Sequence, residues 1–174
     1  PEEKKNRLLK EREELYEKHK GLIQKAFNNG EQGLNKEFDK RLTQSKDEYN
    51  ENVESHKSDL EEALEESEDA GDRREARNNY RDTIQEEEEA FKTEKEEIVS
   101  EYDQRLKELK EERDEKLNEL TETYENDVED IKEETFNDDD LKQTKRDFEA
   151  EEIGFDTLEE YVEEDDDEEE SSSY

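Results

Sequence analysis

The stretch YRDTIQEEEEAFKTEKEEIVSEYDQRLKELKEERDEKLNELTETYENDVEDI, residues 80–131, repeats its apolar side chains at a fixed interval. Aromatic residues stand at Tyr80, Phe91, Tyr102 and Tyr124, which are separated by 11 residues or by a multiple of 11. Most positions four and seven residues beyond them are apolar too. An 11-residue interval corresponds to about 3.67 residues per helical turn, and it produces a nearly straight or slightly right-handed supercoil. The stretch therefore predicts a long helix with a narrow apolar seam.

A second stretch, upstream, has the same 11-residue interval. Leu34 and Phe38 are followed 11 residues later by Ser45 and Tyr49. Two amphipathic stretches with one period predict two helices that pack along their seams as a coiled coil. The predicted seam residues are Leu34, Phe38, Leu42, Tyr49, Val53, Leu60, Leu64, Tyr80, Ile84, Phe91, Ile98, Tyr102, Leu106, Leu109, Leu117, Leu120, Tyr124, Val128 and Ile131.

The sequence Asp69-Ala70-Gly71-Asp72 separates the two periodic stretches. It favours a tight connection, with Asp72 as the N-cap of the helix that follows. The phase of the 11-residue repeat also slips at this point. The slip and the turn signal together predict an all-α fold, a long antiparallel coiled-coil hairpin in which the residue numbers of facing positions sum to about 141. The alternative is an extended rod that dimerises in parallel.

Other breaks divide the rest of the chain. Asn28, Asn29 and Gly30, followed by Gly33, suit a helix C-cap and a short loop, and they predict a kink near residue 30. The predicted segments are an N-terminal amphipathic helix at 1–29, a first long helix at 34–68, a second long helix at 73–136, short helical segments at 137–162, and an acidic, largely disordered tail at 163–174.

The composition restricts the classes of partner. Only 24% of the residues are hydrophobic, 52% are charged, and the net charge is −35. So few apolar residues predict narrow seams instead of a compact core. The negative charge argues against direct binding of nucleic acid and against an anionic membrane surface, because both need clustered basic residues. We expect protein partners that are basic or that belong to a large assembly, with the chain acting as a homo-oligomer or a docked subunit.

The C-terminal segment is the candidate partner-binding region. Residues 137–174 hold 18 acidic and 3 basic residues, a net charge of −15. Carboxylates bind Lys and Arg side chains, and aromatic rings between them fill apolar pockets on a partner. The candidate partner-binding residues are Phe155, Tyr161, Glu163, Glu164, Asp165, Asp166 and Asp167.

The chain offers little for catalysis or for metal binding. It has no cysteine and two histidines, and neither histidine has a second histidine or cysteine four residues away. We expect His19 to lie on a solvated face, and His56 to interrupt the seam and set the register of the helices. Carboxylates are abundant, but general acid–base catalysis requires a pair of them within a pocket. No cofactor, no metal and no catalytic residue is predicted.

The sequence is consistent with two alternative functions. The first is a non-enzymatic structural, scaffold or assembly protein, in the cytosol or inside a viral particle. No run of apolar residues approaches the roughly 20 that a membrane-spanning helix needs. The second is an acidic DNA mimic, or a chaperone that sequesters a basic nucleic-acid-binding protein. A run of carboxylates imitates a line of phosphates only where the acids are concentrated, as at Glu86–Glu89 and in the tail.

Overall fold

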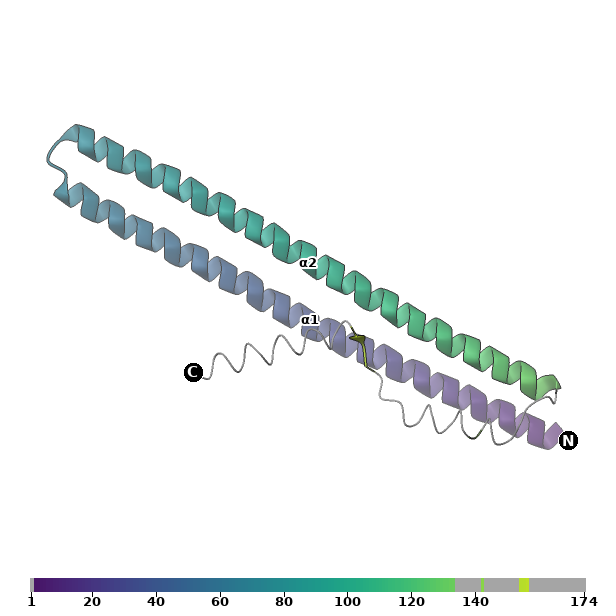
Figure 1. Ribbon diagram of the computed structural model, residues 1–174. Helices are drawn as coiled ribbons and strands as arrows, with labels where there is room; N and C mark the ends of the chain where they lie inside the picture. Colours follow the sequence, from purple (N-terminus) through teal and green to yellow (C-terminus); the bar gives the residue numbers. More distant parts are fainter. Residues whose placement is uncertain (1, 134–141, 143–153, 157–174) are drawn as a thin grey trace. The chain divides into compact units, whose positions relative to one another are not determined.

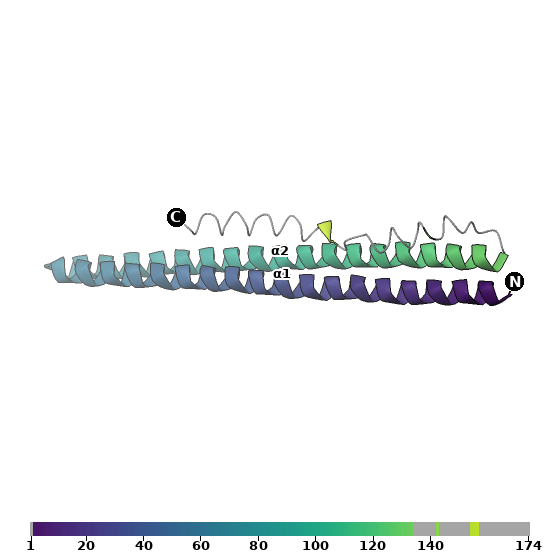
Figure 2. The same ribbon diagram turned by 90° about the horizontal axis from the view of Figure 1, so that it is seen from below.

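The computed structural model describes residues 2–133, 142 and 154–156. Two long α-helices account for most of them: α1, Glu2–Glu66, and α2, Ala70–Glu133 (Figures 1 and 2). Glu, Lys, Arg and Leu favour helix, and the single proline is Pro1, ahead of α1. No strand occurs within the described ranges, so the predicted all-α class is confirmed.

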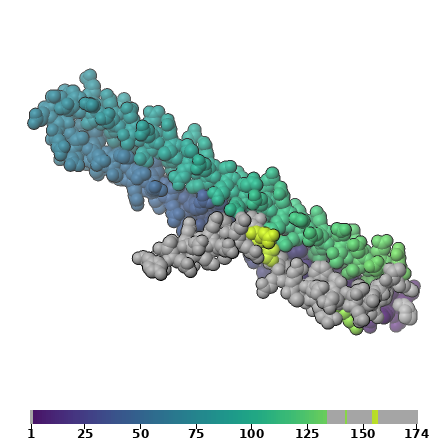
Figure 3. Space-filling model, in the orientation of Figure 1, coloured from purple at the N-terminus to yellow at the C-terminus, as the bar shows by residue number. Residues whose placement is uncertain are grey.

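The chain divides into two units, which we treat separately. Unit 1 comprises Pro1–Gly33 and Arg105–Tyr174, and unit 2 comprises Leu34–Gln104. In unit 2 the second half of α1 turns back through a short connection and packs against the first half of α2. In unit 1 the start of α1 packs against the second half of α2. In the space-filling view, the side chains of the two helices of unit 2 meet between the helices (Figure 3).

The helices of each unit pair in antiparallel fashion. In unit 2, the Phe38 and Tyr102 rings meet edge to face, with centroids 5.4 Å apart. The Tyr49 and Phe91 rings stack in the same unit at 4.9 Å. In unit 1, the Tyr16 and Tyr124 rings stack at 4.7 Å. The residue numbers of each pair sum to 140, close to the predicted 141. This is the pairing of the predicted helical hairpin and not that of the extended parallel rod.

The connection, residues 67–69, begins two residues and ends three residues earlier than predicted. The α1 helix ends at Glu66, and the Ser67 hydroxyl donates a 2.6 Å hydrogen bond to the Ala63 carbonyl. The Asp69 carboxylate accepts a 2.8 Å bond from the backbone N–H of Asp72, which makes Asp69 the N-cap of α2. The assignment of this role to Asp72 is therefore wrong, and residues 70–72 form the first turn of the helix. A Cβ atom on Gly71 would lie 3.2 Å from the Asp69 carboxylate, so glycine leaves room for this cap.

The predicted break near residue 30 is also wrong. The α1 helix runs without interruption through residues 28–33, so residues 2–29 and 34–66, which fall in the two predicted segments 1–29 and 34–68, belong to one helix. Phe27 and Leu34 lie on either side of this stretch and are 3% and 1% exposed. Their burial offsets the helix-breaking tendency of the residues between them, which is about 1 kcal/mol per glycine. The boundary between the two units nevertheless falls at Gly33.

The C-terminal predictions fall mostly outside the described residues. The described part of α2 ends at Glu133, and residues 134–136 are not described. The predicted short helical segments at 137–162 are described only at Lys142 and at 154–156, and the predicted acidic tail is not described at all.

Gly33 gives a direct test of the continuous helix. A Cβ atom at this position would meet no atom within 4 Å. We expect Gly33→Ala to raise the free energy of unfolding by about 0.5–1 kcal/mol, because alanine loses less backbone entropy than glycine in a helix. Urea denaturation followed by circular dichroism measures this change. A loop at residue 33 would instead give a loss of stability or no change.

The core is thin. All 19 predicted seam residues are buried or half-buried. Within the described residues the buried apolar side chains are Ile23, Phe27, Leu34, Phe38, Ile98, Leu109, Leu120, Ile131 and Phe155. The rest of the seam is half-buried, because two helices cover each other on one side only.

Candidate functional site

Phe155 forms an aromatic site in unit 1. Its side chain is 2% exposed and packs in a cluster with Ile23, Phe27, Leu109 and Leu120. The partly buried residues at the edge of the cluster are Tyr16, Ala26 and Leu117. The sequence predicted Phe155 as an anchor for a partner. In the structure its side chain is instead buried within its own chain.

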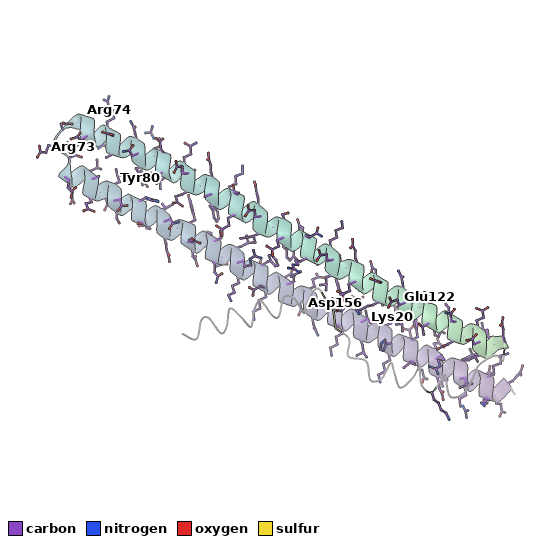
Figure 4. The ribbon with its side chains drawn as sticks, viewed as in Figure 1. Lys20, Arg73, Arg74, Tyr80, Glu122 and Asp156 are labelled. Carbon is purple, nitrogen blue, oxygen red and sulfur yellow. The ribbon has the colours of Figure 1, made fainter. Side chains whose placement is uncertain are left out.

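Polar contacts surround this Phe155 site. The backbone N–H of Asp156 donates a 2.6 Å hydrogen bond to the Glu112 carboxylate. The Lys116 ammonium lies 5.7 Å from the centroid of the Phe155 ring, and the Arg113 guanidinium lies 4.3 Å from that of Phe27. Figure 4 labels Asp156 beside the helices. Residues 154–156 are thus held by one buried ring, one backbone hydrogen bond and a cation near the ring.

The spacing of α1 explains where this site forms. Ala26 and Phe27 lie three and four residues after Ile23, and Gly30 lies four and three residues after them, so all four lie on one helix face. Gly30, which was interpreted as a helix breaker, is a buried position on this face.

Unit 2 has a large side chain at the position eleven residues beyond Gly30. Eleven residues beyond Gly30 stands Arg41, and eleven before Glu112 stands Glu101. In unit 2 these two form a 2.9 Å ion pair, and the Arg41 guanidinium lies 4.8 Å from the Phe38 ring centroid. A large side chain therefore takes the position that glycine has in unit 1.

A groove opens between the helices of unit 2. It encloses about 360 Å³. We call it the Val99 groove; its lining residues are Asn35, Phe38, Asp39, Leu42, Ile98, Val99 and Tyr102. Phe38 and Ile98 are 3% and 5% exposed, whereas Val99 is 41% exposed.

A second cavity, of about 390 Å³, lies near the connection in unit 2. Small side chains on both helices, Ala63 and Ala76, leave this space. Tyr80 lines it and points from α2 toward α1 (Figure 4). Leu60 lines it too, and the remaining lining residues are polar, among them His56, Asp59 and Glu75.

Polar residues also join the two helices inside the seam. In unit 2, Glu87 contacts His56 Nε2 at 3.1 Å and accepts a 3.3 Å hydrogen bond from the Asn52 amide. In unit 1, His19 is only 6% exposed, so its expected solvated position is wrong. His19 lies three residues after Tyr16 and four before Ile23, on the face that packs against α2.

Unit 1 contains an ion pair between the buried Arg12 and the half-buried Asp127, with 3.8 Å between the Arg12 Nη1 and Asp127 Oδ2 atoms. Arg12 is 7% exposed. Burial raises the pKa of Asp127; Arg12 opposes this rise and Asp130 adds to it. Burial also raises the pKa of the nearby Tyr124 phenol, and the negative charges of Glu13 and Glu17 raise it further. The pair links the helices at the cost of desolvating two charges.

The remaining predicted site residues are not described. Tyr161 and the acidic residues Glu163, Glu164, Asp165, Asp166 and Asp167 all lie outside the described ranges. A search of the described residues found no group of three or more His, Cys, Asp or Glu side chains that could hold a metal ion. None of the described helices is apolar enough over a sufficient length to cross a membrane.

Sequence reasoning missed the role of Phe155 within the chain and the Val99 groove. A single phenylalanine among acidic residues gives no signal of where it packs. Val99 did give a signal, since an apolar residue directly after the seam residue Ile98 lies beside the seam and not within it.

Comparisons of the chain with protein-family models, with curated proteins and with solved structures found no match.

Proposed function

We propose that this chain is a non-enzymatic coiled-coil protein that acts as a structural scaffold or assembly component within a larger complex. One observation carries the proposal: most of the apolar side chains that the structure describes lie in a seam between two long helices, and most of that seam remains half-buried. Such a seam gains stability when another helix or a protein surface covers its open side. The finer interpretation, a coiled coil with 11-residue repeats, rests on the periodicity of the sequence.

Fixed pairing supports this role. Aromatic pairs, the Arg12–Asp127 ion pair and the His56–Glu87 contact recur along the seam. Each is satisfied in one alignment of the helices and broken by a shift, because a slip moves every side chain to a different neighbour. A defined alignment keeps surface residues at fixed spacings, as a scaffold requires.

The test is purification of the chain from its native source under mild conditions, followed by identification of the proteins that accompany it. We expect either a stoichiometric protein partner or a homo-oligomer, retained at about 0.5 M salt, because apolar contacts are not screened as surface charges are. A monodisperse monomer that carries no partner at any salt concentration would overturn the proposal.

A second candidate is capture of a basic nucleic-acid-binding protein by the acidic surface, as a DNA mimic or chaperone. It is favoured by the run Glu86–Glu89, in which Glu86, Glu88 and Glu89 are exposed. This function predicts competition with DNA for a basic protein, and binding that falls steeply as salt rises. The same purification separates the two candidates, since a partner held by charge alone is lost at 0.5 M salt, a concentration at which the Debye length is only about 4 Å.

A further inference from the structure

Val99 is unusual in a chain that has so few apolar residues. Within the described ranges only Leu22 and Val99 are large hydrophobic side chains with substantial exposure, at 43% and 41%. Val99 differs from Leu22 in its surroundings, because it lies at the mouth of the Val99 groove, above the buried side chains of Phe38 and Ile98. The groove therefore combines buried apolar residues, Phe38 and Ile98, with the exposed apolar residue Val99, and its polar lining residues are Asn35 and Asp39.

The groove is held in shape by contacts that need no partner. The Tyr102 hydroxyl donates a hydrogen bond to the Asn35 side-chain carbonyl, across the two helices. The Tyr102 ring packs edge to face on Phe38 at 5.4 Å. The Arg41 guanidinium covers Phe38 and is itself fixed by Glu101. A preformed groove costs little conformational entropy when it binds.

The Phe155 site indicates the kind of side chain that such a groove accepts. In unit 1, the Phe155 ring is buried against apolar side chains of both helices. The Val99 groove likewise presents apolar side chains of both helices, Phe38 and Leu42 from α1 and Ile98 and Val99 from α2. A volume of about 360 Å³ is at the low end for a ligand pocket, and it suits one large side chain better than an extended ligand. An aromatic side chain offers the largest apolar contact for one residue.

The charge around the groove indicates the charge of the partner residues on either side of that aromatic side chain. On the α2 side, residues 94–103 hold five acidic residues and one basic residue, a net charge of −4. On the α1 side, residues 34–43 hold two acidic and three basic residues, a net charge of +1. Unit 2 as a whole, residues 34–104, holds 25 acidic and 11 basic residues, a net charge of −14. A basic segment is attracted to this surface, and a second copy of the chain, with its charge of −35, is repelled.

We propose that the Val99 groove binds a basic segment of a partner protein through one aromatic side chain, seated between Val99 and Tyr102. This inference rests on the proposed function, since it names the surface and the partner chemistry through which the scaffold works.

The test uses the full chain and two synthetic peptides. One peptide is rich in lysine and arginine with a single central phenylalanine, and the other is identical except that glycine replaces the phenylalanine. We expect the phenylalanine peptide to bind about tenfold more tightly by calorimetry, because only it buries an aromatic ring. We expect Val99→Gln to remove this tenfold difference. The matched control Leu22→Gln should preserve it, because Leu22 is equally exposed but lies outside the groove.

Three outcomes would overturn the proposal. Equal affinity of the two peptides would mean that charge alone binds them. A difference that survives Val99→Gln would place the ring elsewhere. Self-association without peptide that Val99→Gln abolishes would make a second copy the occupant. The proposed function is judged separately. If a stoichiometric native partner binds the Val99→Gln variant as well as the original chain, the scaffold function stands and the proposal for the groove fails. If the chain distinguishes the two peptides but has no native partner, the proposal for the groove stands and the scaffold function fails.

Discussion

Leu109→Ala is expected to lower the free energy of unfolding by about 3 kcal/mol. Leu109 is 0% exposed and packs in the cluster that holds Phe155. Replacing a buried leucine with alanine removes its transfer free energy and leaves a cavity, a loss of about 2–5 kcal/mol in well-packed proteins. Urea denaturation followed by circular dichroism at 222 nm measures the change.

The matched control for this substitution is Leu22→Ala. Leu22 is 43% exposed, so the same chemical change should alter the free energy of unfolding by less than about 0.5 kcal/mol. Equal effects at the two positions would mean that the seam does not pack as described.

Arg12→Gln is expected to destabilise the chain by about 2 kcal/mol at pH 7. It leaves the half-buried Asp127 carboxylate without this cation, and breaking a buried pair typically costs about 3–5 kcal/mol. We expect a smaller loss here because the pair is long, at 3.8 Å, and Asp127 keeps some contact with water. Arg81→Gln is the control, because Arg81 is exposed and should be nearly neutral.

The effect of Arg12→Gln should depend on pH. Burial raises the pKa of Asp127 in the folded chain above 3.8, so the folded chain binds this proton more tightly than the unfolded chain does. The stability that the protonated Asp127 contributes is fully present below pH 3.8 and is lost as pH rises through the folded pKa. Loss of Arg12 raises this pKa further. The destabilisation should therefore be greatest at neutral pH and shrink as pH falls toward 3.8. A loss that stays constant from pH 7 to pH 3 would mean that the pairing of Arg12 with ionised Asp127 contributes nothing.

The periodicity of the sequence predicted the pairing well. The 11-residue spacing of residues such as Phe38, Phe91 and Tyr102 identified the helix faces. The turn signal near Gly71 predicted that the numbers of facing residues sum to about 141, and the observed sum is 140. Both signals depend on local geometry, namely the number of residues per turn and the residues that a tight connection needs.

Errors arose where packing overrides local preference. Gly30 and Gly33 signal the end of a helix when they are considered alone, but the buried neighbours Phe27 and Leu34 keep the helix intact. His19 was expected in solvent from its charged neighbours in sequence, whereas its helix face determines its burial. Phe155 could not be placed at all, since its contacts are with residues more than 30 positions away.

Every site described above depends on the antiparallel pairing of α1 and α2. Because the chain has no cysteine, spin labels can be introduced at chosen cysteine pairs, and their separation measured by double electron–electron resonance. Two suitable exposed pairs are Lys18 with Glu122 in unit 1 and Glu48 with Lys92 in unit 2, and the residue numbers of each sum to 140. Each doubly labelled chain is diluted with unlabelled chain, so that only distances within one chain are recorded.

The pairing predicts a separation below about 35 Å for both pairs, because packed helix axes lie about 8–10 Å apart and the labels add their own reach. One continuous rod would instead place the labels about 156 Å apart in the first pair and about 66 Å apart in the second, at about 1.5 Å per residue. Distances of that size in either pair would contradict the pairing, and with it the Phe155 site and the Val99 groove.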